Sequence, residues 1–219
     1  MDDRFSERLG LGVPHGWWAS ASLLKSFEAA GFAWVQVHAP PSSVLAEPRQ
    51  CVAYAAALRA SLATTRLRPV VHAPDGLRAG SSLADAALEG LLSYAVAITA
   101  SQGRLHIIAE RRKTSRATLV EPVLDLVTLF HLHDNLGARW AGARSDPALD
   151  PLRLDLHLPP GAGTLPWPSV APTLRHHRAA LICEVHPPHL GKRAGLFASA
   201  ARLIDAIAPA VPGPATASG

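Results

Sequence analysis

Short apolar runs alternate with longer amphipathic stretches along the whole chain. The apolar runs that predict β-strands cover residues 9–13, 34–38, 69–72, 104–109, 127–132 and 181–185. The stretches with helical spacing cover residues 20–30, 44–63, 82–100, 118–125, 167–175 and 196–208. Strands that alternate with helices predict a parallel sheet with helices outside it. The fold class that we expect is therefore α/β.

An internal repeat makes this expectation more specific. The segment VQVHAP at 35–40 resembles PVVHAP at 69–74, and 34 positions separate His38 from His72 and His72 from His106. One strand, one helix and two loops take roughly that length in a (β/α)₈ barrel. We therefore expect a single (β/α) TIM-barrel-like domain over residues 1–208, with these histidines at the C-terminal ends of successive strands. The Pro- and Ala-rich segment 209–219 is expected to be a flexible tail.

The composition narrows the class of protein. The chain has 219 residues, of which 48% are hydrophobic and 17% charged, so it is long enough to bury a sizeable core. The absence of any run of about 18 apolar residues predicts that it does not span a membrane, and the absence of a signal peptide predicts a cytoplasmic protein. The net charge of +4 comes from scattered arginines, which disfavours nucleic acid as a partner. Two cysteines cannot form a disulfide framework.

The chain contains eleven histidines, and several stand beside carboxylates. His131 and His133 alternate along a predicted strand, so their side chains share a face. Asp155 and His157 form a second alternating pair, and Glu184 lies at the end of the last predicted strand. Imidazole nitrogens and carboxylate oxygens are suitable ligands for Zn²⁺, Mn²⁺ and similar ions. These residues therefore predict a metal site.

The same segments resemble the xylose-isomerase-like barrel superfamily, which contains sugar (phosphate) isomerases and epimerases and apurinic-site nucleases of the endonuclease IV type. The matching pieces are His72-Ala-Pro74 at a third strand, His106 in a fourth, HLHDN at 131–135 in a seventh, Asp155-Leu-His157 followed by GAG at 161–163, and Glu184 on the last strand. The resemblance extends over residues 9–208 and is most specific from 131 onward.

The resemblance implies a divalent metal cofactor (Mn, Mg, Co or Zn) and a role for each matching residue. The implied metal ligands are His131 and Glu184, with His72, His106, Asp155 and His157 added in the nuclease branch. Glu184 is also the implied catalytic proton carrier, in a reaction whose enediolate the metal stabilises. The residues that we expect to contact a sugar or sugar phosphate are His38, His133, Asp134 and Trp17.

The chain departs from the superfamily between the fourth and seventh strands. Only 17 residues separate Ala109 from Val127, whereas two further strand–helix units need about 60. We therefore expect a reduced barrel of about six strands that lacks strands five and six, and with them a second metal-binding glutamate and an Asp-x-x-His pair. A second subunit is one way to cover the open edge of such a sheet, which makes a homo-oligomer a candidate assembly.

Three functions remain open. The first is a metal-dependent sugar (phosphate) isomerase or epimerase, with turnover weakened by the missing glutamate. The second is a phosphodiesterase of the endonuclease IV type, which lacks its bridging glutamate and an evident DNA-contacting loop. The third is a non-catalytic remnant of the barrel that binds a metal or a sugar.

Overall fold

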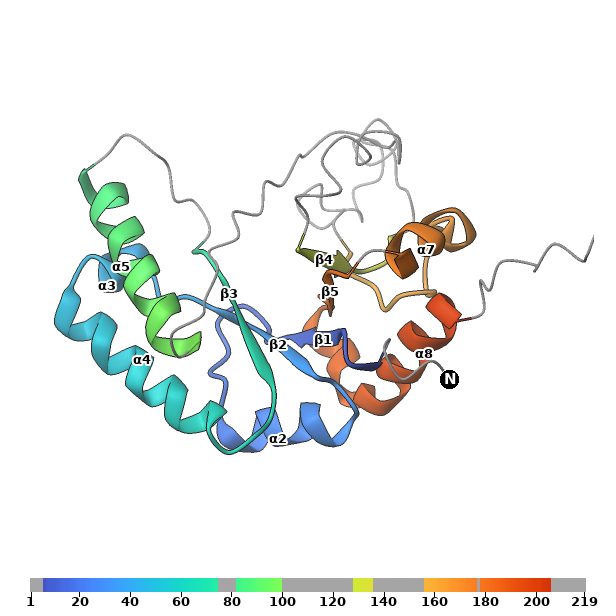
Figure 1. Cartoon of the computed structure of the whole chain (residues 1–219), viewed down its shortest axis with the longest axis horizontal. Coiled ribbons are helices and arrows are strands. Elements are labelled where there is room, and N and C mark those ends of the chain that lie inside the picture. Colours follow the sequence, from blue (N-terminus) through green and yellow to red (C-terminus); the bar gives the residue numbers. More distant parts are fainter. Residues whose placement is uncertain (1–5, 75–81, 100–127, 136–155, 177, 206–219) are drawn as a thin grey trace, which may run out of the picture.

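A five-stranded parallel sheet, curled into a half-barrel, organises the fold (Figure 1). The computed structural model describes residues 6–74, 82–99, 128–135, 156–176 and 178–205. The strands are β1 (Leu9–Gly12), β2 (Trp34–His38), β3 (Arg68–His72), β4 (Leu129–Leu132) and β5 (Ala180–Cys183). Their spatial order is β3-β2-β1-β5-β4, and every neighbouring pair is parallel. The C-terminal ends of all five strands therefore meet at one edge of the sheet.

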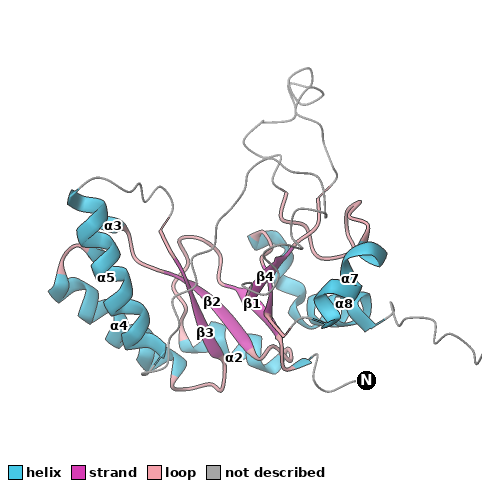
Figure 2. Cartoon of the chain, turned by 45° about the horizontal axis from the view of Figure 1, so that its top comes forward, coloured by secondary structure: helices cyan, strands magenta, loops and turns pink. Residues whose placement is uncertain are grey.

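Helices surround the outer side of the curved sheet (Figures 1 and 2). They are α2 (Ala21–Ala29), α3 (Ser42–Leu45), α4 (Pro48–Leu62), α5 (Ser82–Thr99), α7 (Trp167–His176) and α8 (Arg193–Asp205), with a 3₁₀ helix, η4 (Pro187–Lys192), before α8. The start of α2 follows the prediction, because the Ser20 hydroxyl accepts a hydrogen bond from the Leu23 amide as an N-cap. None of the helices within the described residues combines the length and the apolar character that crossing a membrane requires.

Alternation along each strand separates the core from the concave face of the sheet. Leu9 and Leu11 of β1 are fully buried in the hydrophobic core with side chains from the helices, as is Val35 of β2. The intervening positions, Gly12 and Gln36, point to the other face and sit opposite each other in the sheet register. The outer face therefore supplies stability, and the concave face is left for polar chemistry.

Helix α5 packs unusually close to α3. The residues that α5 buries are Ala87, Leu91, Tyr94 and Ile98. Between them lies Gly90, where an added Cβ would fall on the carbonyl oxygen of Leu45 in α3. The two helices therefore meet backbone to backbone, which only glycine allows at this position.

The predicted strand–helix alternation is confirmed wherever the structure describes the chain. The described residues contain five strands, and the expected total was about six. Three predicted segments lie outside the described residues: the strand at 104–109, the helix at 118–125 and the tail at 209–219. The single helix expected over 44–63 is in fact two, α3 and α4. Glu47 has an extended backbone (φ −107°, ψ 98°) because it precedes Pro48, which then opens α4.

Replacing Gly90 by alanine tests the contact between α3 and α5. We expect Gly90→Ala to lower the free energy of unfolding by about 1–3 kcal/mol, because the new methyl group forces the helices apart. At a solvent-exposed helix position the same change raises the free energy of unfolding by up to about 1 kcal/mol. A decrease therefore indicates the close contact, and an increase indicates its absence. Urea unfolding followed by circular dichroism measures it, with Ser93→Ala on the exposed side of α5 as the matched control. A Gly90→Ala protein as stable as the wild type would contradict this packing.

Candidate functional site

A row of imidazole rings follows the C-terminal edge of the sheet from β1 to β4. His38 ends β2 and His72 ends β3, and the two are register partners with ring centroids 5.0 Å apart. His15, just after β1, meets His38 edge-on at 5.3 Å. On the far side, the rings of His72 and His131 stack 6.1 Å apart, inclined by 13°. Of the three histidines expected on one rim, His38 and His72 lie there, and His106 lies outside the described residues.

A second group of imidazoles continues the row beyond β4. The ring of His133 lies 4.3 Å from that of His157, which in turn lies 5.2 Å from that of His186. His157 has a positive φ of 39°, a conformation that costs a non-glycine residue about 1–3 kcal/mol. Its carbonyl oxygen accepts a hydrogen bond from the His186 amide at 3.2 Å. The chain therefore holds His157 in a strained position between two other histidines.

A hydrogen-bonded network of Gln36, His131 and Glu184 forms the centre of the site. His131 Nδ1 lies 3.0 Å from Glu184 Oε2, and His131 Nε2 lies 2.5 Å from Gln36 Oε1. Gln36 closes the triangle by donating from Nε2 to Glu184 Oε1 at 3.1 Å. The expected approach of His131 and Glu184 at the edge is therefore confirmed.

The partners in this network determine which atoms face His131. An ionised carboxylate only accepts hydrogen bonds, so Gln36 turns its NH₂ group to Glu184 and its carbonyl oxygen to His131. Both nitrogens of His131 then face acceptor oxygens. The arrangement therefore suits a ring that donates from both nitrogens.

The network passes over Gly12 of β1. Gln36 belongs to β2 and Glu184 follows β5, and β1 lies between those two strands. The side chain of Gln36 therefore crosses over β1 at Gly12, where an added Cβ would lie 3.8 Å from both Gln36 Nε2 and the Glu184 Cα. A larger side chain at Gly12 would occupy the path of the Gln36 amide.

The Glu184 carboxyl is strongly acidic in this setting. Burial favours its neutral form, but the hydrogen bond from His131 and the charges that His131, His157 and His72 carry when protonated outweigh burial and lower the pKa of Glu184 to about 2. The side chain is 19% exposed, so part of the carboxylate still reaches solvent. Glu184 is therefore ionised at neutral pH.

His72 presents a defined tautomer to the site. Its Nδ1 lies 2.6 Å from the carbonyl oxygen of Ala73, which can only accept, so Nδ1 carries the proton. In the neutral ring the lone pair is then on Nε2. This nitrogen is the one able to accept a proton, and the ring that bears it stacks on His131.

Asp134 is a structural residue of the loop after β4. It is fully buried, and its carboxylate oxygens accept hydrogen bonds from the Asn135, Gly161 and Leu165 amides and from Trp167 Nε1, at 2.8–3.1 Å. Burial opposes its ionisation, but these hydrogen bonds prevail and lower the pKa of Asp134. We expected Asp134 to contact a substrate, whereas its burial and its donors favour a role in holding the 158–167 loop against β4.

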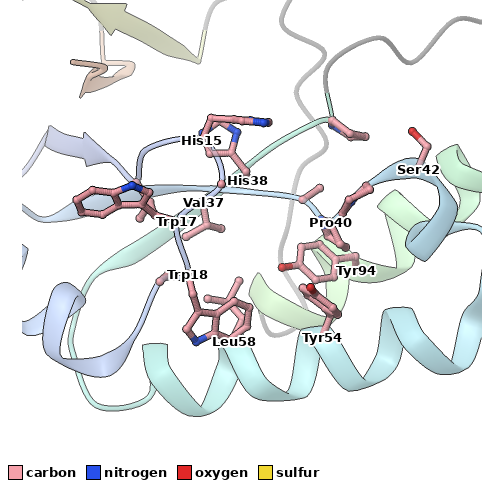
Figure 3. A pocket seen from close by; sticks show the side chains of 16 residues that line it. His15, Trp17, Trp18, Val37, His38, Pro40, Ser42, Tyr54, Leu58 and Tyr94 are labelled. Atoms are coloured by element: carbon pink, nitrogen blue, oxygen red, sulfur yellow. The ribbon is translucent and has the colours of Figure 1, made fainter. Parts of the chain in front are cut away.

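Trp17 and His38 line a cavity of about 540 Å³ beside the row of histidines (Figure 3). Trp17 is half-exposed at the mouth of this cavity. His133, the remaining residue expected to contact a substrate, belongs to the second group of imidazoles. Two of the residues expected to contact a sugar, Trp17 and His38, thus lie at one cavity, and His133 lies elsewhere. Their contact with a sugar stays a prediction.

The residues that are described do not form a metal site as they are arranged. The chemistry of the donors is suitable, since His72, His131, His157 and Glu184 lie along one edge. Within the described part of the chain, however, no three histidine, cysteine or carboxylate side chains are grouped closely enough to hold an ion. His131 also uses both nitrogens in hydrogen bonds. His106 and Asp155, the other two implied ligands, lie outside the described residues, so the metal site stays a prediction.

Sequence reasoning missed Gln36, which connects the two sides of the site. The signal was present: Gln36 is a lone polar residue in the apolar run of β2, and in the structure it is fully buried. A buried side-chain amide needs hydrogen-bond partners. Its alternation with His38 would have placed both on the concave face.

The ionised Glu184 carboxylate predicts a particular dependence of stability on pH. Because folding lowers its pKa from 4.5 to about 2, the stabilisation is fully present above pH 4.5 and is lost as the pH falls toward 2. Its full size is on the order of 3 kcal/mol. We therefore expect urea unfolding to show a difference between wild type and Glu184→Gln that is largest near pH 6–7 and narrows between about pH 4.5 and 2. A difference that stays constant over this range would contradict the ion pair.

The hydrogen bonds of Asp134 predict that this residue stabilises the loop rather than binding a ligand. Asp134→Ala would leave Trp167 Nε1 and buried backbone amides without their acceptor, at a cost of about 3 kcal/mol in the free energy of unfolding. Asp134→Asn keeps one acceptor oxygen and should lose less. Thermal unfolding and amide hydrogen exchange of residues 161–165 measure both effects. An Asp134→Ala protein within about 0.5 kcal/mol of the wild type would show that this role is wrong.

Comparison with protein-family models, with curated proteins and with solved structures finds no match for this chain, so the assignment of its function depends on the geometry of the site itself.

Proposed function

We propose that this protein moves a proton at a carbon atom next to the carbonyl group of a small sugar or sugar phosphate, in the manner of an isomerase or epimerase. The observation that carries the proposal is the pair of Glu184 and His131, with the His72 ring stacked beside it at the C-terminal edge of the sheet. One arrangement thus combines a proton acceptor with a positively charged hydrogen-bond donor. Proton transfer through an enediolate requires these two groups.

The strand order supports a reduced (β/α)₈ barrel as the fold behind this site. In a doubly wound sheet of order 3-2-1-4-5, the chain returns beside β1 and then moves outward. Here the last strand, β5, lies beside β1, and β4 lies outside it. This is the order of a barrel whose last strand closes onto the first. Active sites of such barrels lie at the C-terminal ends of the strands, where these residues are.

His72 is the proposed general base. Its Nε2 bears the lone pair, because Nδ1–H is donated to the Ala73 carbonyl. Histidine is the side chain best suited to accept and return a proton near neutral pH. His72 thereby fills the place of the second proton-handling carboxylate that the sequence lacks.

His131 is the proposed stabiliser of the negative charge that develops on the substrate oxygen. Its Nε2–H now donates to the Gln36 carbonyl oxygen, and a substrate carbonyl that replaces this acceptor would receive the same hydrogen bond. Glu184 contacts the other nitrogen, Nδ1, at 3.0 Å and so orients the ring. With a pKa near 2, Glu184 is a weak base, so in this proposal it holds His131 in place and charged rather than removing the proton itself.

A second function, binding without turnover, is favoured by the closed form of the network. Both nitrogens of His131 and both oxygens of Glu184 are already engaged within the protein. A substrate must displace Gln36 to reach His131, which costs the enzyme one buried hydrogen bond. A binding protein for the same sugars would need no such displacement.

Exchange of substrate hydrogen with solvent tests the proposed reaction. Incubation with common aldoses, ketoses and their phosphates in D₂O should place deuterium on the carbon next to the carbonyl group, detected by NMR. We expect His72→Asn and His131→Asn to lower the exchange rate by about 10²–10⁴-fold, because each removes one of the two groups that handle the proton or its charge. His189→Asn on η4 is the matched control and should exchange at the wild-type rate.

The outcomes separate the proposed functions. Sugar binding without exchange in the wild type would support the binding protein, and unchanged exchange in His72→Asn would remove His72 as the base. The same assay with added Mn²⁺, Mg²⁺, Co²⁺ or Zn²⁺, compared with chelator, tests the predicted metal independently.

A further inference from the structure

The cavity beside His38 has walls of a different character from the row of histidines. It has a volume of about 540 Å³, within the roughly 300–1,000 Å³ range of small-molecule sites. Figure 3 shows the loop after β1, the end of β2 and the helices α4 and α5 around it. The network of Gln36, His131 and Glu184 is not part of its lining. This hollow is therefore distinct from the proposed proton-transfer site.

Three partly exposed aromatic residues are among those that line this cavity. Trp17, Trp18 and Tyr54 remain 49%, 46% and 41% exposed, although each has a large apolar surface. The rings of Trp18 and Tyr54 meet edge-on, with centroids 5.8 Å apart. This contact links the loop after β1 to α4. Partly exposed aromatic rings beside a hollow are typical of a binding site.

The polar side chains that line the cavity are hydroxyl, indole and imidazole groups. Of the residues that the structure shows lining it, none is a lysine, an arginine, an aspartate or a glutamate. Tyr94 is almost fully buried against the cavity, and burial raises the pKa of its hydroxyl, which therefore stays a neutral phenol. His15 and His38 supply the imidazoles on the side toward the sheet. Val13, Val37 and Leu58 complete an apolar lining.

We propose that this cavity binds a neutral aromatic ring, such as a phenol or an indole, between Trp18, Tyr54 and the apolar residues at its base. Aromatic pairs gain about 0.5–1.5 kcal/mol beyond the burial of their surface, and Trp18 and Tyr54 already show the edge-on geometry that such pairs prefer. A hydroxyl or ring N–H of the ligand would find hydrogen-bond partners in the His38 imidazole and the Tyr94 hydroxyl. The cavity is connected to the proposed proton-transfer site through His38, whose ring lies 5.0 Å from that of His72.

The lining argues against the two obvious competing ligand classes. A phosphate or carboxylate is normally held by arginine or lysine side chains, and the described residues that line this cavity include neither. A free sugar presents many hydroxyl groups, which would lose their hydration against valine, leucine and proline without enough partners. An aromatic ring with one or two polar substituents matches both the apolar walls and the small number of polar groups.

Ligand-observed NMR and calorimetry with the full-length protein test this site. Phenol and indole are the probes; benzoate carries the same ring with a negative charge, and glucose and glucose 6-phosphate represent the competing classes. We expect saturable binding of phenol and indole, and binding of benzoate and both sugars at this cavity that is at least about tenfold weaker. Trp18→Ala should weaken phenol binding by about tenfold, whereas Tyr54→Phe, which keeps the ring, should bind like the wild type.

Two further variants keep the test decisive. Tyr54→Ala removes the other ring of the edge-on pair and should weaken phenol binding as Trp18→Ala does, while Leu165→Ala, an exposed apolar position outside the cavity, should not. Circular dichroism confirms that each variant is folded. The proposal is overturned if phenol and indole do not saturate, if glucose 6-phosphate or benzoate binds more tightly, or if folded Trp18→Ala and Tyr54→Ala proteins bind phenol like the wild type. None of these results depends on whether the protein exchanges protons on a sugar.

Discussion

The need to satisfy the buried amide of Gln36 connects the two halves of this molecule. Gln36 comes from the N-terminal part of the sheet, and its partners, His131 and Glu184, come from the C-terminal part. An amide without partners in this position would cost about 1–3 kcal/mol. The hydrogen bonds reach across β1 because Gly12 leaves the concave face open there. This one crossing brings Gln36, His131 and Glu184 into a single hydrogen-bonded network.

Much of the fold could be predicted because it depends on local pattern. The strands recur with apolar alternation, and helix α2 begins at a serine cap, as its sequence indicates. The division of 44–63 into α3 and α4 follows from Pro48, a local signal whose effect on Glu47 the apolar periodicity concealed. The close approach of α3 and α5 could not be predicted, because a glycine within a helix does not indicate which backbone it will meet. That information lies in the tertiary packing.

The site was predictable in its position and less so in its chemistry. The repeat placed His38 and His72 on one edge, and the alternation of the later strands brought His131 to Glu184. The hydrogen-bond partners of His131 could not be predicted, since they depend on which atom of Gln36 faces the ring. For Asp134, the sequence pattern and the structure favour different roles. An aspartate beside two histidines is typical of a binding site, yet its neighbours in space are backbone amides and an indole that need an acceptor.

The position of β1 at the centre of the sheet also determines the order in which the chain can fold during synthesis. β1 pairs with β2, which follows it by about 25 residues along the chain. Its other neighbour in the sheet is β5, so Leu9 cannot pair on that side until Leu181 has been synthesised. Arg8 likewise hydrogen-bonds to the carbonyl oxygens of Leu174 and Ala179, which leave the ribosome long after it does. Until then one edge of β1 is exposed to solvent and to other chains, and such contacts between distant residues form slowly. That edge of β1 is therefore covered only after β5 has been synthesised.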